Sequence, residues 1–465
     1  PAITPVETNA GKQSEFVKQI QAMPSTPVAP VFLDYNKDMQ KGKLGKAEVL
    51  YVQNKDNDLF RLNFRYKMGS LNDLKMAVAA QYIQFLGTDK KSAEQISKEF
   101  YKIASSFRVT TNEEYTYVTI EGLQENFQAA VALYEDLVLH AKVDEQALQS
   151  LKARIAKYRG DVKANRNQIM QALTSYALYG PKNKYNHALS NAQLEATTAE
   201  ELVDRIKKLN EVEQTIIYYG PASLKQLTQK LDKLHKVPTE FAQVPPAQRF
   251  EQLTPTQNKV LFTDYEMVQA ETRWVRNTDT YNPAETTLIR VFNNYFGGSM
   301  SSLVFQTIRE SKALAYSTYG TYRIPAKKQD KYYMLAYVGT QADKFQEAIS
   351  AMNELLTTMP EIPDNFQLAK GQLKQDIQTD RITQDNIIFS YLAAQQLGLK
   401  EDIRKNVYEQ VDKITFKDIQ AFHNKYLSHK PYTYVILASE KRLPKEELQK
   451  IGEFKKVSLE ELFGF

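Results

Sequence analysis

The alternation of apolar and polar residues predicts an α+β chain whose elements come in two similar runs. Segments 48–53 and 59–67 are rich in β-forming residues, and the polar residues between them have turn composition. Apolar periodicity predicts helices over 72–86, 93–106, 127–140 and 144–165, and strands over 107–111 and 115–122. Thr198 and Glu201 have the spacing of a capping box at a helix start, and 215–219 (TIIYY) is typical of a closing strand.

The same order of elements returns in the second half. FQEAISAMNELL at 345 resembles FQAAVALYEDLV at 127, an offset of 345 − 127 = 218 residues. Thr415 and Asp418 repeat the capping pair at an offset of 415 − 198 = 217. We therefore expect two homologous α+β domains, each an antiparallel or mixed sheet with helices packed on one face. The expected boundaries are a connector over 1–45 with a short helix at 12–22, domains over 46–236 and 259–465, and a Pro-rich linker over 237–258.

Composition narrows the class of protein without identifying an activity. The chain has 465 residues, no cysteine and a formal net charge of +5 that is spread along its length. A small, dispersed charge gives no reason to expect nucleic-acid binding. No apolar run is long enough to predict a membrane span. The lack of cysteine excludes disulfides, thiolate metal sites and cysteine nucleophiles, and it leaves the compartment open.

Motifs for common active sites are absent. The chain contains no G-x-x-x-x-G-K, no G-x-G-x-x-G and no G-x-S-x-G. No two of the five histidines have the i, i+4 spacing that presents both imidazoles to zinc from one helix. His423 and His429, near a predicted helix end, are expected at the surface. The sequence alone therefore contains no complete active site.

The segment YFGGSMSSLVFQTIRESKALAYSTY, residues 295–319, carries the one candidate pair. The two glycines at 297 and 298 break the preceding apolar run, and Ser299, Ser301 or Ser302 is expected to cap a new helix. Arg309 and Tyr316 could together hold a peptide carbonyl or an oxyanion, because a guanidinium is always charged and a phenol donates a hydrogen bond. The simpler alternative is a surface arginine paired with Glu310 and a half-buried tyrosine.

This segment resembles the signature of the last domain of the second half in the pitrilysin or insulinase-like zinc metallopeptidases. In that family two halves, each of two α+β domains, close around a peptide. The resemblance implies that Arg309 and Tyr316 reach across to the zinc site and bind the substrate carbonyl. By element order it extends over nearly all of residues 46–465.

The zinc motif of the family, H-x-x-E-H on a helix followed by Gly-Thr, is degenerate here. When VAAQYIQFLGT is anchored on its Gly-Thr, Val78, Gln81 and Tyr82 stand at the positions of the first histidine, the glutamate and the second histidine. None of the three can take over its role. A later helix offers only Asp161 for the further glutamate ligand. The resemblance therefore implies no cofactor in this chain and zinc in a partner half.

The implied function is the non-catalytic half of a zinc endopeptidase that encloses and helps to cleave unfolded peptides. Its partner would be an N-terminal zinc-bearing half on the same precursor, or a separate H-x-x-E-H subunit, and this chain would be inactive alone. A catalytically inactive structural or binding subunit of a complex is the alternative, and an independent enzyme with a novel site is a third. The chain is compatible with a periplasmic or exported protein whose leader lies upstream.

Overall fold

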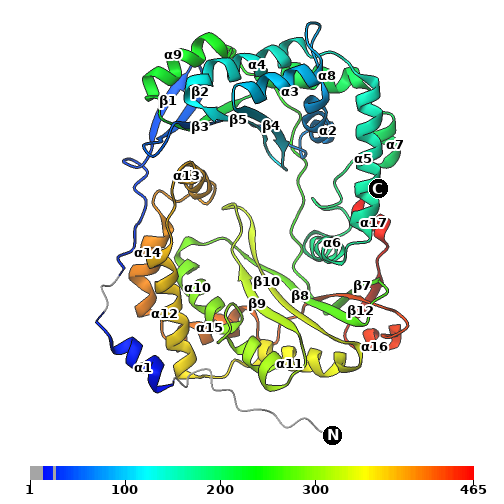
Figure 1. The fold of residues 1–465 in the computed structure, drawn as a ribbon. Helices are drawn as coiled ribbons and strands as arrows, with labels where there is room; N and C mark the ends of the chain where they lie inside the picture. The colour runs from blue at the N-terminus through cyan, green and yellow to red at the C-terminus, as the bar shows by residue number, and fades with distance from the viewer. Residues whose placement is uncertain (1–13, 25–27) are drawn as a thin grey trace.

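Two six-stranded sheets form the centre of the computed structural model, which describes residues 14–24 and 28–465 (Figure 1). Their strand orders are β1-β2-β6-β3-β5-β4 and β12-β7-β11-β8-β10-β9. The first sheet consists of β1 (Gln40–Leu44), β2 (Ala47–Gln53), β3 (Leu59–Tyr66), β4 (Ser105–Thr111), β5 (Thr116–Leu123) and β6 (Gln214–Gly220). The second consists of β7 (Lys259–Asp264), β8 (Gln269–Thr280), β9 (Ser317–Arg323), β10 (Lys331–Gln341), β11 (Thr433–Ala438) and β12 (Glu453–Lys456).

The two sheets have the same internal pairing. β3 pairs antiparallel with β5 and β6, as β8 does with β10 and β11, whereas β2 with β6 and β7 with β11 run parallel. They differ at one edge, where β1 is antiparallel to β2 but β12 is parallel to β7. The predicted class, α+β with two similar mixed sheets, is therefore confirmed.

Helices cover the outer face of each sheet and bury its apolar residues (Figure 1). The first unit contributes α2 (Leu74–Tyr82), α3 (Ala93–Lys102), α4 (Phe127–His140), α5 (Glu145–Lys163), α7 (Asn191–Glu195), α8 (Ala199–Lys208) and α9 (Leu224–Leu234). The second contributes α10 (Thr286–Phe296), α11 (Phe345–Thr357), α12 (Pro363–Thr379), α14 (Ile403–Gln410), α15 (Phe416–Tyr426) and α16 (Lys445–Gln449).

Local sequence explains several boundaries. Thr198 and Thr415 each begin their helix, α8 and α15, with a reciprocal capping box, as predicted. The helix predicted over 93–106 ends earlier, at Lys102, because Ala104 takes a left-handed φ of 45° that starts the turn into β4. His423, predicted at the surface, is buried, because α15 continues past it and turns its ring towards α11, where Nε2 lies 3.0 Å from the carbonyl oxygen of Leu355.

One helix from each unit packs on the sheet of the other. Helix α6 (Arg166–Tyr179) lies on the second sheet, where Leu173 joins an apolar cluster with Val275 and Val435. Helix α13 (Asn386–Gln396) lies on the first sheet, where Ile388 joins a cluster with Leu50 and Ile217. Figure 1 shows these two helices on the inward faces of the sheets, on opposite sides of the molecule. The exchange joins the two units through two buried apolar clusters.

An ion pair stands at the start of each exchanged helix. Asp385, the N-cap residue of α13, accepts from Arg61 on β3, with Nη1 and Oδ1 3.1 Å apart. Arg166, the first residue of α6, lies 3.4 Å from Glu271 on β8. The two carboxylates are almost fully buried, with side chains 5% and 6% exposed. Each helix start is thereby fixed to the opposite unit.

The segment before β1 crosses the second unit. The backbone N–H of Leu33 donates to Asp402, and Arg404 holds the same carboxylate while it donates to the carbonyl oxygen of Val31. Part of the predicted connector, residues 1–13 and 25–27, lies outside the described residues, so the helix predicted from residue 12 is seen only as α1 (Glu15–Ala22). The boundaries given above for the two domains stay a prediction. Across the described ranges, none of the helices is long and apolar enough to cross a bilayer.

Candidate functional site

Helix α2 carries the three residues at the zinc-motif positions. The side chain of Asp73 caps its first turn by accepting from the N–H of Lys75. Val78 and Tyr82 are buried on the core side, whereas Gln81 is exposed and donates back to the carbonyl oxygen of Ala77. The sequence thus places an ordinary, largely apolar core helix at this point, packed against the first core.

These side chains do not fit a metal ion. Val78 has no donor atom, and the hydroxyl of Tyr82 is engaged with Asp144, donating to the carbonyl oxygen at 2.7 Å and accepting from the N–H at 3.0 Å. Burial raises the pKa of that hydroxyl, which makes a phenolate ligand still less accessible. Asp161 is exposed on α5, and within residues 14–24 and 28–465 no three His, Cys, Asp or Glu side chains gather as a metal-binding group.

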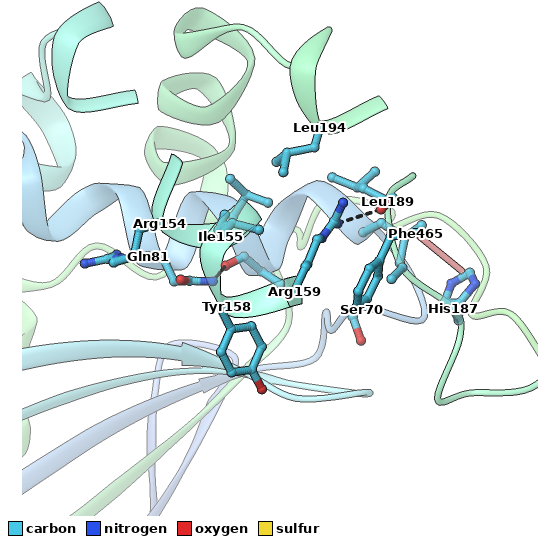
Figure 2. Close-up of a pocket in the computed structure, with 14 residues that line it drawn as sticks. Ser70, Gln81, Arg154, Ile155, Tyr158, Arg159, His187, Leu189, Leu194 and Phe465 are labelled. Carbon is cyan, nitrogen blue, oxygen red and sulfur yellow. Dashed lines mark hydrogen bonds between the residues drawn. The ribbon is translucent and has the colours of Figure 1, made fainter. Parts of the chain in front are cut away.

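A cavity of about 580 Å³ lies beside these positions, between α2, α5 and the loop before α7 (Figure 2). Arg159 of α5 reaches into it and donates to the carbonyl oxygen of Leu189 at 2.6 Å and to Asn191. Burial lowers the pKa of Arg159 and of His187, which also lines the cavity. The guanidinium of Arg159 lies 4.4 Å from the ring of Phe465. The zinc-motif positions therefore lie next to an apolar hollow, which no local sequence signal predicts.

The Arg309 segment belongs to the second unit. A Cβ on Gly297 would overlap the backbone of Gly320 on β9, so glycine is needed for this close approach. The helix that follows is a π-helix over Phe305–Ser311, and no serine side chain caps it, which corrects the predicted cap. The hydroxyl of Ser302 instead donates to the carbonyl oxygen of Ser299. Widened π turns often occur at functional sites.

Arg309 lies on this π-helix with its side chain 46% exposed. Its Nε is 3.6 Å from Glu310, which is equally exposed, and its guanidinium lies over the ring of Phe305 at 4.8 Å. Surface ion pairs of this kind contribute little stability, so the pair leaves the guanidinium free to change partners. The surface pairing weighed as the simpler alternative is present in the isolated chain.

Tyr316 stands just before the edge strand β9 and is 68% exposed. Its backbone N–H donates to the carbonyl oxygen of Gly339, which fixes the main chain while the side chain stays exposed to solvent. A left-handed residue, Ala313 with φ 49°, turns the chain between the π-helix and this strand. Within the described residues no hydrogen bond joins Arg309 to Tyr316, and the turn at Ala313 separates the two along the chain.

Two family models match consecutive stretches of the chain. The model described as insulinase (peptidase family M16) matches residues 67–192, and the model described as peptidase M16 inactive domain matches residues 196–372. The two stretches together cover more than half of the chain. The first contains all three degenerate zinc positions, and the second contains the Arg309 segment.

Curated relatives are similar at low identity. The "uncharacterized zinc protease YmxG" of Bacillus subtilis is 25% identical over 324 residues, which are 64% of this chain and 73% of the relative. The "non-peptidase homolog YmxG" of Helicobacter pylori is 20% identical over 416 residues, which are 85% of this chain and 93% of the relative. One relative is thus named as a protease and the other as a homolog without peptidase activity.

Solved structures share the fold. A peptidase M16 inactive domain from Pseudomonas fluorescens has a TM-score of 0.66 at 14% identity, over 86% of this chain and 98% of that one. The periplasmic protease PqqL from Escherichia coli has a TM-score of 0.67 at 11% identity, over 94% of this chain and 48% of that one. This chain therefore matches the whole of one structure and about half of the other.

Proposed function

The chain belongs to the M16 peptidase family, and we propose that it is the non-catalytic half of a zinc endopeptidase that encloses unfolded peptides. The observation that carries the proposal is a contrast between the two units. The zinc-motif positions on helix α2 carry side chains that do not fit a metal ion, whereas Arg309 and Tyr316 are exposed, and the one ion pair of Arg309 among the described residues is the exposed one with Glu310. Zinc and its general base would then belong to another half or subunit.

The chemical role of this chain would be binding and charge stabilisation. Tyr316 would donate a hydrogen bond to the carbonyl oxygen of the scissile peptide, and Arg309 would place a fixed positive charge beside it. Both groups help most when that oxygen becomes negative in the tetrahedral state, and closure of the two halves would strengthen them by excluding water. The exposed pair with Glu310 can be exchanged for the substrate at little cost.

Two arrangements of the zinc half are open, and each has support. The 48% coverage of the longer PqqL chain favours two halves in one polypeptide. The 98% coverage of the Pseudomonas fluorescens structure favours a separate subunit of this length. In either arrangement an H-x-x-E-H half is the expected partner.

A second function is favoured by one relative. The Helicobacter pylori protein, which this chain matches over 93% of its length, is named as a non-peptidase homolog. A structural or binding subunit would keep the fold and its partners without contributing to cleavage. Under this alternative, changes at Arg309 would affect nothing beyond stability.

The two functions are separated by reconstitution with the zinc half. Arg309→Ala and Tyr316→Phe should each lower kcat for a quenched peptide by about 10²-fold if they stabilise an oxyanion. The zinc content of the complex should stay the same. Arg323→Ala, which removes an exposed arginine at the end of β9, is the matched control and should leave turnover unchanged. Wild-type turnover in both variants would exclude the assigned role and favour the binding subunit.

A further inference from the structure

The cavity beside α2 has an apolar wall and a cationic rim. Most of its lining is apolar, and the aliphatic residues that line it are Leu74, Ala77, Val78, Ile155, Ala188, Leu189 and Leu194. Its volume of about 580 Å³ is within the range of binding sites for small ligands and exceeds the space that one aromatic side chain needs. Helices α2 and α5 fix the wall, so the hollow is largely preformed.

The charged side chains that line the cavity are all basic. Arg154 and Arg159 line it, and none of its lining residues in the described part of the chain is acidic. Arg154 is exposed, makes no ion pair within that part, and lies over the ring of Phe85 at 4.9 Å. Burial keeps His187 neutral near pH 7 by lowering its pKa. A ligand with an apolar body and a carboxylate would complement this arrangement.

One wall of the cavity includes an aromatic ring of the chain itself, that of Phe465. Phe465 lines the cavity, with the guanidinium of Arg159 4.4 Å and the ammonium of Lys163 5.5 Å from its ring. Figure 2 shows Arg159 extended between Leu189 and this ring. The cavity therefore already has a phenyl ring in its wall, beside a cation that favours its π face.

From these three observations we infer that the cavity is a peptide-binding subsite, which takes an aromatic side chain and pairs Arg154 with an acidic neighbour in the same peptide. The inference rests on the proposed function for the class of ligand. The subsite would be a second place where the peptide binds. It lies beside the degenerate zinc positions in the first unit, whereas Arg309 and Tyr316 belong to the second unit. A substrate held there would be retained by a surface that takes no part in cleavage.

The test uses this chain alone, without a zinc half. A fluorescein-labelled Gly-Ser peptide that carries a Glu-Phe pair is titrated by fluorescence anisotropy against the wild type and Ala77→Trp, which fills the hollow from α2. We expect Ala77→Trp to weaken binding at least about tenfold, as does replacement of Phe by Ala in the peptide. Ala129→Trp, on the exposed face of α4, is the control and should bind as the wild type does.

The role of the Arg154 charge is tested with a second variant. This variant also keeps the proposal testable if Ala77→Trp does not fold. Arg154→Gln should weaken the Glu-Phe peptide several-fold and leave a Gln-Phe peptide unchanged. Equal affinity for the Phe and Ala peptides, or equal loss for both peptides in Arg154→Gln, would overturn the subsite. Arg309→Ala should leave this binding intact, so the subsite and the proposed role in cleavage can fail independently.

Discussion

The exchanged helix α6 gives the sharpest test of how the two units are joined. Leu173 is fully buried, and although it belongs to the first unit, it packs against Val275 and Val435 of the second sheet. Leu173→Ala removes three carbon atoms, which at about 0.8 kcal/mol per buried CH₂ is about 2.4 kcal/mol of transfer free energy. The cavity left behind raises the expected loss of unfolding free energy to about 2–5 kcal/mol.

The assay uses the single tryptophan of the chain. Trp274 is buried in β8, so its fluorescence reports the second unit, whereas far-ultraviolet circular dichroism reports both. We expect Leu173→Ala to lower the urea midpoint of the Trp274 transition by about 1 M, taking a denaturant slope of about 3 kcal/mol per M. Leu139→Ala, at an exposed position of α4, should change it little. A Trp274 transition that stays in place while the dichroism transition moves would refute the coupling.

Two further predictions concern the second core. Burial lowers the pKa of His423 below its ordinary 6.5, so the unfolded chain takes up this proton before the folded one, and stability should fall as the pH drops below about 6.5. His423→Gln, which keeps a donor for the carbonyl oxygen of Leu355, should flatten that part of a plot of unfolding free energy against pH, and an unchanged slope would contradict the assignment. Gly297→Ala should cost about 1–3 kcal/mol by thermal unfolding, because its Cβ overlaps the backbone of Gly320. Gly371→Ala, in open space on α12, should not destabilise, and equal melting temperatures for the two variants would exclude the close approach as a constraint.

The sequence predicted elements well where a local signal was present. Helix α4 occupies the predicted 127–140, since its apolar period is uninterrupted between the end of β5 and the start of α5. Thr198 and Thr415 marked two helix starts because a capping box is complete within four residues. The early end of α3 depends on the left-handed backbone of Ala104. Alanine is a good helix former, so its presence did not indicate a helix end at this position. The degenerate zinc positions were identified by resemblance to the family motif, not by a local structural signal.

Features that depend on tertiary contacts could not be predicted. An apolar helix face, such as that of Leu173, does not indicate which sheet will cover it. The packing of α6 and α13 on the sheet of the opposite unit could therefore not be predicted from the local sequence. The burial of His423 depends on the approach of α11, which lies about 70 residues away in sequence. The cavity beside α2 is formed by three separate segments, and Phe465 joins them only in the folded chain.

The ion pairs at the exchanged helices bear on which units can combine. Arg61 lies opposite Tyr219 and Glu271 opposite Leu437 in the two sheets, and these are equivalent places in the repeat. Two copies of the first unit, paired in the same manner, would set Arg166 against Arg61. Two copies of the second would set Asp385 against Glu271. Two carboxylates in the nearly fully buried places of Asp385 and Glu271 would repel strongly, whereas the two arginines are 43% and 52% exposed and would repel less. The reversal of sign therefore disfavours the symmetric dimer of the second unit most. The two units of the chain are thus similar in fold but opposite in charge at this contact, which favours pairing of one unit with the other over pairing with a copy of itself.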